Sequence, residues 1–204
     1  MRIISFLIIC LIFTQCSSNR VNQSIDIITY HFNNHVQTID SDKNTTRYYY
    51  SSNKVIPNKE MIRIMKEHLV YTKKNGNYEG KILSKFYSKE LENQLSTDSS
   101  YDIYGEWNSE EIKLLKEGNI KVLIDSTEFY GEAFKKLTYN NINVDENYYL
   151  AVYSRPVKIE KEVFAFQVIV FDTFGMINNP HVLVYRKIGN SFELLEKIED
   201  TNLY

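Results

Sequence analysis

The second half of the chain contains the sequence VFAFQVIVF, which runs from Val163 to Phe171 and is interrupted only by the polar Gln167. Aromatic and β-branched residues favour a pleated, packed surface, and a continuous apolar run of this kind is typical of a buried strand. The run has less than half of the roughly 20 residues that a membrane-spanning helix needs. We therefore predict a central strand in a soluble body.

Three further strands are predicted around this run, because the neighbouring segments either alternate with a period of two or are continuously apolar. They are Tyr148–Ser154, His181–Lys187 and Phe192–Ile198. Gly189 and Asn190 supply the turn between the last two strands, since glycine adopts positive φ without a Cβ clash. The four strands are predicted to form an antiparallel meander.

The first half of the chain shows helical periodicity instead. Apolar residues recur at spacings of three and four over residues 25–39 and again over residues 61–69, which places them on one face of each helix. Pro57 fits the first turn of the second helix, where its missing N–H has no intrahelical partner. The aromatic residues of Thr45–Ser51 predict a strand between the two helices.

A third helix, over residues 109–117, has the clearest end signals. Asn108 or Ser109 accepts hydrogen bonds from its first amides, and Gly118 follows its last turn. Residues 83–95 predict another helix, and residues 121–125 a short strand. Runs of helices followed by runs of strands indicate an α+β fold, with N-terminal helices followed by a C-terminal antiparallel β-meander.

The N-terminus has the layout of an export signal. Arg2 supplies one positive charge, residues 3–13 are almost all apolar, and Cys16 precedes the polar residues 17–19. This arrangement resembles a bacterial lipoprotein leader, in which the cysteine thiol receives a diacylglyceryl group and becomes the first residue of the mature chain. Gln15 stands where that family usually has a small residue. The resemblance implies a signal peptide (1–15), a tether (16–23), one folded domain (24–204) and lipidation at Cys16.

An acylated Cys16 would hold the domain on a membrane, because each buried methylene contributes about 0.8 kcal/mol and stable anchoring takes at least two chains. The other cysteine, Cys10, lies inside the leader. The mature domain is therefore expected to contain no free thiol, which argues against disulfides, thiol nucleophiles and thiolate metal sites.

Two segments of the C-terminal half, Tyr153–Val157 and Val184–Lys187, precede a short terminal strand. This ending resembles that of many small uncharacterised secreted proteins of the Bacteroidota, although Phe192 stands where they typically carry a tryptophan. That family has no established activity to carry over. Surface-exposed lipoproteins of that phylum often have an acidic cluster after the lipidated cysteine, and Ser17–Val21 has none. The resemblance thus implies an outer-membrane lipoprotein that faces the periplasm.

The overall charge is close to balanced. The chain has 24 Lys and Arg against 26 Asp and Glu, a formal net charge of −2, and no basic cluster. This balance argues against nucleic acid as a partner. With 43% hydrophobic residues and only 7 Gly and 3 Pro, the composition is typical of an ordinary folded domain rather than a disordered chain.

Two histidines are candidate metal ligands. His31 and His35 are four residues apart on the first predicted helix and would face the same way, as paired metal-binding imidazoles do. No third ligand accompanies them with motif spacing, and Asp40 and Asp42 lie just past the helix. A solvated polar face is the simpler interpretation, so no metal ligand and no cofactor is predicted.

Two further patterns bear on catalysis. Ser51 and Lys54 have the Ser-x-x-Lys spacing of penicillin-recognising enzymes, but the companion motifs of those enzymes do not follow. Asp172 ends the most apolar strand, where a carboxylate can be catalytic, but in an antiparallel meander it more simply begins a turn. No catalytic residue is therefore predicted.

The chain is 14% aromatic. Tyr48–Tyr50, Tyr101, Tyr104 and Trp107 are the first place to look for a surface that stacks on sugars. The simpler interpretation is that most rings fill the core, where each buries about 150 to 250 Å².

These observations lead to one hypothesis and two alternatives. The hypothesis is a membrane-anchored envelope lipoprotein that is a non-enzymatic binding or interaction module with a protein or glycan partner. One alternative is a periplasmic inhibitor or immunity-type protein. The other is an envelope hydrolase whose dispersed residues come from the set His31, His35, His68, His181 and Asp172. Convergence of two or more of these within hydrogen-bond reach in a concave pocket would favour the hydrolase.

Overall fold

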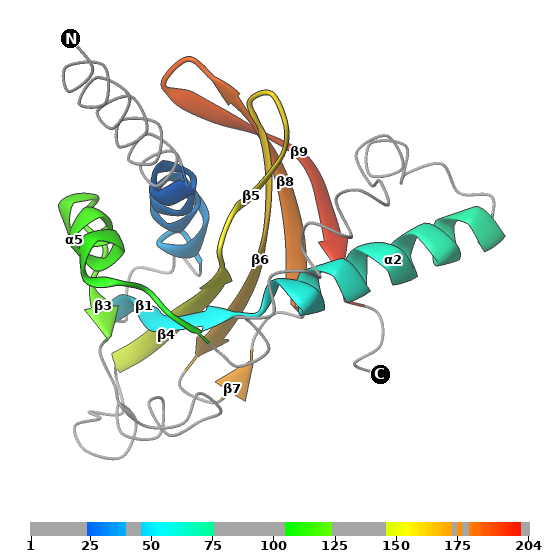
Figure 1. Ribbon diagram of the computed structural model, residues 1–204. Coiled ribbons are helices and arrows are strands. Elements are labelled where there is room, and N and C mark those ends of the chain that lie inside the picture. The colour runs from blue at the N-terminus through cyan, green and yellow to red at the C-terminus, as the bar shows by residue number, and fades with distance from the viewer. Residues whose placement is uncertain are drawn as a thin grey trace, which may run out of the picture.

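The structure is a computed structural model that describes residues 24–39, 46–75, 105–123, 146–172, 175–176 and 180–200. About half of these residues lie in strands and about a third in helices. The predicted α+β class is therefore wrong. The fold is mostly one mixed sheet, which takes strands from both halves of the chain (Figure 1).

Within the described residues the sheet has nine strands. Its main path runs β2 (Gly105–Glu106), β1 (Thr46–Ile56), β4 (Glu146–Ser154), β6 (Val163–Asp172), β8 (His181–Ile188) and β9 (Ser191–Glu199). Three short strands lie off this path, β3 (Val122–Leu123) beside β1, and β5 (Val157–Glu160) and β7 (Gly175–Met176) beside β6.

The strand β1 explains why the predicted class is wrong. It runs parallel to β4, with a shift in register between Ser51 and Val55. The strand continues five residues past the predicted end at Ser51, through a polar stretch that is buried between neighbouring strands. Backbone hydrogen bonds to neighbouring segments pair main-chain groups of this stretch. The Ser51 N–H donates to the Lys121 carbonyl at 2.9 Å, and the Trp107 N–H donates to the Asn53 carbonyl at 2.9 Å.

The four strands predicted in the C-terminal half are confirmed as β4, β6, β8 and β9, and each pairs antiparallel with the next. The last hairpin turns at Gly189, whose φ of 59° is in the left-handed region. The additional strand β5 was not predicted. It is short, and it reaches β6 through a turn in which Glu162 adopts a φ of 61°.

The helices also match their sequence signals where they are described. Residues 24–31 are α-helical and continue into a π-helical turn, η1 (Phe32–Val36). The helix α2 (Asn58–Asn75) begins just after Pro57, and α5 (Ser109–Glu117) begins with a reciprocal capping box between Asn108 and Glu111. The predicted helix over residues 83–95 lies outside the described residues.

The two faces of the sheet pack against different helices. On β6, Phe164, Phe166, Val168 and Val170 share a core with the helix of residues 24–36, whereas Val163 and Ala165 share one with α2. The two helices accordingly lie on opposite sides of the sheet in Figure 1. None of the described helices is both long and apolar enough to cross a membrane.

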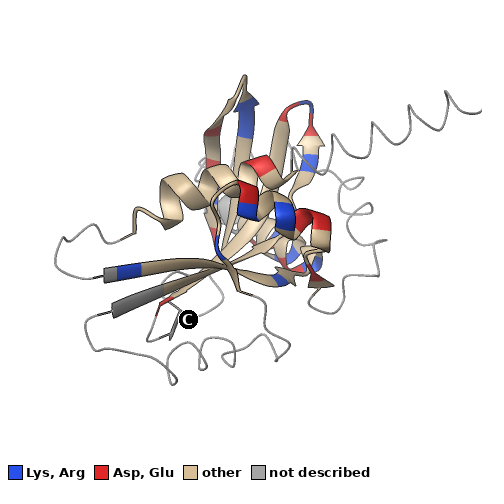
Figure 2. Ribbon diagram, turned by 90° about the vertical axis from the view of Figure 1, so that its left-hand side faces the viewer, with Lys and Arg blue, Asp and Glu red and all other residues tan. Residues whose placement is uncertain are grey.

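The helix α5 covers the flank next to the first helix. A Cβ at Gly118 would lie 2.5 Å from the Thr29 side chain, so only glycine allows this close approach. The exposed side of α5 carries both signs of charge, including an ion pair of 3.7 Å between Lys113 and Glu117. Basic and acidic residues are likewise mixed on the face shown in Figure 2.

Candidate functional site

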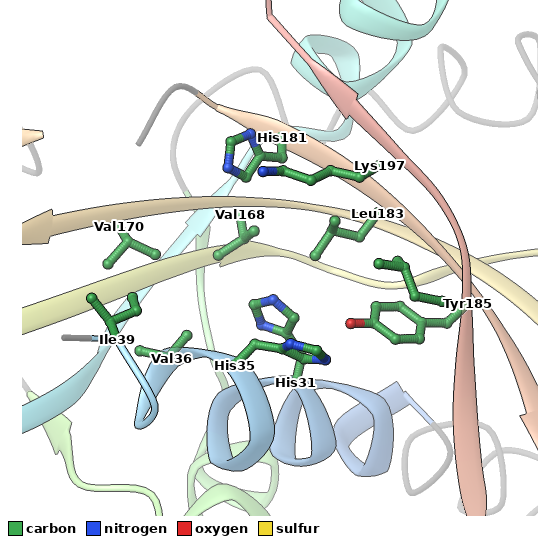
Figure 3. A pocket seen from close by; sticks show the side chains of 11 residues that line it. His31, His35, Val36, Ile39, Val168, Val170, His181, Leu183, Tyr185 and Lys197 are labelled. Atoms are coloured by element: carbon green, nitrogen blue, oxygen red, sulfur yellow. The ribbon is translucent and has the colours of Figure 1, made fainter. Parts of the chain in front are cut away.

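A pocket of about 170 Å³ lies between the helix of residues 24–36 and the strands β6, β8 and β9 (Figure 3). Its polar lining consists of His31, His35, His181, Tyr185 and Lys197. Its apolar lining consists of Val36, Ile39, Val168, Val170, Leu183 and Leu194. The exposed residues His35, Leu194 and Lys197 mark its solvent side, and Tyr185 and His31 lie at its buried side.

Local periodicity places these residues on facing surfaces. His31 and His35 occupy neighbouring turns of the helix, as residues four apart do. On β8, His181, Leu183 and Tyr185 alternate along the strand and so share one face. The register pairs Val168 of β6 with His181, which puts an aliphatic side chain of the lining beside that histidine.

The rings of His31 and His35 stack, with centroids 5.2 Å apart and planes inclined by 27°. The helix changes from α to π at this pair, and the Gln37 N–H donates to the Phe32 carbonyl at 2.9 Å. Single π-helical turns inside helices occur frequently at functional sites. The sequence prediction that the two imidazoles face the same way is therefore confirmed, although His31 is buried rather than solvated.

His31 is held as a neutral imidazole. Its Nδ1 lies 3.1 Å from the Tyr153 hydroxyl in a buried hydrogen bond. The pKa of His31 is lowered to about 3, mainly by burial and to a smaller extent by the nearby His35 and His181. Burial also raises the pKa of Tyr153 well above its ordinary value, so neither partner carries a charge near neutral pH.

Two buried polar atoms at the pocket have no hydrogen-bond partner among the described residues: the Tyr185 hydroxyl and His181 Nδ1. Tyr185 is 1% exposed and His181 is 9% exposed. In Figure 3 the Tyr185 hydroxyl points toward the two helical histidines, and His181 lies beside Lys197. A buried polar group without a partner costs about 1 to 3 kcal/mol, and native proteins contain few of them. Similar unpaired atoms, such as Trp107 Nε1 and Gln167 Oε1, occur away from the pocket in the described part of the chain. A molecule that reached the Tyr185 hydroxyl and His181 Nδ1 from the pocket would supply their missing partners.

The pocket carries little charge near neutral pH. Burial, and then the charge of Lys197, lower the pKa of His181 to about 4, while Glu199 acts in the opposite direction. Burial also lowers the pKa of His35. Lys197 is the one formally charged residue of the lining, and its ammonium lies 3.2 Å from the Glu199 carboxylate.

The pocket brings together three of the five residues in the dispersed hydrolase set: His31, His35 and His181. Asp172 ends β6 and does not line the pocket, and His68 lies on α2, with Nε2 3.8 Å from Glu196. The lining residues that the structure describes include no Ser, Thr, Cys, Asp or Glu. The lining therefore offers no carboxylate to orient a histidine and no serine or cysteine nucleophile.

Metal binding has no support from the described part of the chain, in which no group of three or more His, Cys, Asp or Glu is arranged to hold an ion. Asp40 and Asp42, which follow the histidine pair in sequence, lie outside the described residues. The lipidation site predicted at Cys16 lies outside them as well.

The other residues that the sequence analysis singled out for catalysis or sugar stacking are paired or packed within the fold where they are described. Ser51 and Lys54 lie on strand β1 rather than on one helical turn, and Lys54 forms an ion pair with Glu106. Trp107 is buried, and the Arg155 guanidinium lies 5.2 Å from its ring. Tyr49 stacks on Tyr149, with ring centroids 5.1 Å apart. Tyr101 and Tyr104 lie outside the described residues.

No protein-family model matches the chain, and comparison with curated proteins and with solved structures found no match. Function must therefore be inferred from the pocket and from the N-terminal sequence.

Proposed function

We propose that this protein is a lipid-anchored binding module of the bacterial cell envelope, and that it binds a small molecule in the pocket beneath its first helix. One observation carries this proposal: the Tyr185 hydroxyl and His181 Nδ1 are buried at the pocket and have no partner among the described residues. A bound molecule that hydrogen-bonds to both atoms would remove the free-energy cost of leaving them unpaired.

The composition of the lining supports binding rather than hydrolysis. Aliphatic side chains with a few converging polar groups are the usual lining of small-molecule sites, which commonly occupy about 300 to 1,000 Å³. A pocket of about 170 Å³ suits a ligand smaller than a typical cofactor. The three histidines of the lining could act as general bases, but among the described residues no hydrogen bond joins any two of them, and the lining has no serine or cysteine nucleophile and no carboxylate to orient them.

The N-terminal sequence supports the location. With Cys16 acylated, a tether of residues 16–23 would reach at most about 28 Å when fully extended, because extended chain spans about 3.3 to 3.6 Å per residue. The described part of the helix that lines the pocket starts at residue 24, eight residues after Cys16 in the sequence. This arrangement keeps the pocket close to the membrane, which we propose is the periplasmic side of the outer membrane.

The anchor is tested by metabolic labelling of cells with a clickable palmitate analogue. We expect the wild-type protein to be labelled and Cys16→Ala to lose the label, because the alanine has no thiol to receive the diacylglyceryl group. Cys10→Ala is the matched control and should lose no label, because that residue lies inside the removed leader. Equal labelling of wild type and Cys16→Ala would refute the anchor.

The pocket is tested by thermal-shift screening of the full chain in detergent against small carboxylates, amides, phenols and monosaccharides. We expect at least one class to raise the melting temperature, and Leu194→Trp to weaken that binding about tenfold or more by filling the mouth of the pocket. Ile188→Trp is the matched control, because Ile188 is equally apolar and 55% exposed but does not line the pocket. The same loss in both variants, or no stabilising compound, would contradict a binding pocket.

A further inference from the structure

The polar lining of the pocket can offer more donors than acceptors. The Lys197 ammonium is a donor only, and tyrosine hydroxyls and imidazoles each have an N–H or O–H to donate. The two atoms without partners, the Tyr185 hydroxyl and His181 Nδ1, belong to this group. No lining residue in the described part of the chain is a carboxylate, which would be an acceptor only. The complement of such a lining is a ligand rich in acceptors.

The donors and the aliphatic residues lie in different parts of the pocket. In Figure 3, Lys197 and His181 lie together on the strand side, and Val168 and Leu183 separate them from the helical histidines. The close approach of Lys197 is reflected in its lowering of the pKa of His181. A ligand with one charged end and a hydrocarbon body would match this distribution.

We propose that the ligand is a small organic carboxylate whose anionic group binds Lys197 and His181 and whose hydrocarbon body packs on Val168 and Leu183. This inference rests on the proposed binding function and assigns its ligand class. The carboxylate accepts hydrogen bonds from the Lys197 ammonium and from the Nδ1–H tautomer of His181. An acceptor elsewhere on the ligand, where present, takes the Tyr185 O–H.

The ion pair of Lys197 with Glu199 does not prevent this binding. The two side chains are 44% and 57% exposed, and exposed pairs contribute only about 0 to 1 kcal/mol. Glu199 is nevertheless a negative charge that competes for the same ammonium. Its neutralisation in Glu199→Gln should therefore strengthen carboxylate binding, whereas a merely structural role for Lys197 would give no such gain.

Binding should also be linked to proton uptake. The groups that face His181 are Lys197 and Glu199 from β9 and His31 from the first helix, while its neighbour on β6 is the apolar Val168. A bound anion adds a negative charge beside this imidazole and raises its pKa from the lowered value of about 4. Affinity for carboxylates should therefore rise several-fold between about pH 7.5 and pH 5.5, where carboxyl groups of pKa near 4 stay ionised.

The experiment is calorimetric titration of the full chain in detergent with isovalerate and benzoate, each matched by its neutral amide. We expect the carboxylates to bind about tenfold or more tightly than the amides, because a hydrogen bond to an ionised carboxylate is stronger than one to a neutral amide. Lys197→Met should lose about tenfold in carboxylate affinity and clearly less in amide affinity, because the neutral amide forms no charge-assisted hydrogen bond. Lys187→Met is the control of equal charge, because Lys187 lies on β8 outside the pocket lining.

The outcomes separate this inference from the proposed function. Equal binding of acids and amides, or binding of neutral compounds alone in the broader screen, would overturn the carboxylate assignment and leave a binding pocket. Equal losses in Lys197→Met and Lys187→Met would also overturn it, because only general charge would then matter. The proposed binding function itself fails if no class of compound in the screen binds, or if Leu194→Trp and Ile188→Trp weaken binding equally.

Discussion

Acidification from pH 7 to pH 4 is expected to lower the free energy of unfolding by about 3 kcal/mol through His31 alone, because each pKa unit corresponds to about 1.4 kcal/mol. His31 is 6% exposed, and its pKa in the folded protein is about 3, against an ordinary value of 6.5. Between these values the unfolded chain binds a proton that the folded chain excludes. The destabilisation therefore begins as the pH falls through about 6.5 and is complete near pH 3.

The groups that face His31 are His35 on its own helix and His181, Tyr153 and Tyr185 from the sheet. The test compares urea unfolding of the wild type with that of the double variant His31→Phe/Tyr153→Phe at several pH values. The double substitution removes the imidazole together with its hydrogen-bond partner, so no buried hydroxyl loses its only partner. The carboxyl groups, which also titrate in this range, are the same in both proteins.

As the pH falls, the wild type should therefore lose more stability than the double variant, and the difference between the two proteins should grow. His68→Phe serves as the control, since His68 lies on α2, on the other side of the sheet, and its replacement should leave the pH dependence steep. If wild type and double variant lose stability in parallel, His31 is not a source of acid sensitivity.

Replacing Phe166 by alanine is expected to lower the free energy of unfolding by about 3 to 5 kcal/mol, the usual range for a buried phenylalanine. Phe166 has no exposed surface and lies on β6, at the centre of the face that the first helix covers. Its ring stacks on Tyr185, with centroids 5.8 Å apart, and meets the edge of His31 at 5.6 Å. Alanine would remove all of these contacts and leave a cavity behind the pocket.

Denaturant unfolding of Phe166→Ala, Phe166→Leu and Ile188→Ala provides the measurement. The leucine variant should lose less than the alanine variant, because it fills more of the same space. Ile188→Ala should change stability by no more than about 0.5 kcal/mol, since surface substitutions away from special features have little effect. A loss in Phe166→Ala as small as that of Ile188→Ala would mean that the ring does not contribute to the core as the structure indicates.

The strands and helix ends that were predicted correctly depend on local patterns. The continuous apolar run VFAFQVIVF indicates a strand from its local sequence alone. Asn108, Glu111 and Gly118 likewise define the ends of α5 through contacts within a few residues. The fold class was wrong because it depends on the pairing of β1 with β4, strands separated by about ninety residues of chain. The polar Ser52 and Asn53 in β1 also concealed the continuation of that strand, since the run of aromatic residues ends at Tyr50.

The sequence analysis predicted no ligand-binding site, but part of the pocket follows from the same kind of local pattern. The spacing of His31 and His35 on a helix showed that their rings would share a face, and alternation along β8 places His181 with Tyr185. The sequence contains no signal for which face of the sheet the first helix covers, or for the register that sets Val168 beside His181. Lys197 was missed altogether, because a charged residue on an edge strand has no local mark of a role in binding.

The described part of the first helix, which starts at residue 24, forms one wall of the pocket, and the proposed anchor at Cys16 lies only eight residues earlier in the sequence. With the proposed acyl chains in place, any pull on the body of the protein would load this helix before it loads the sheet. Mechanical tension at the lipid would thus act on the wall that retains the bound molecule, and displacement of that wall would release it.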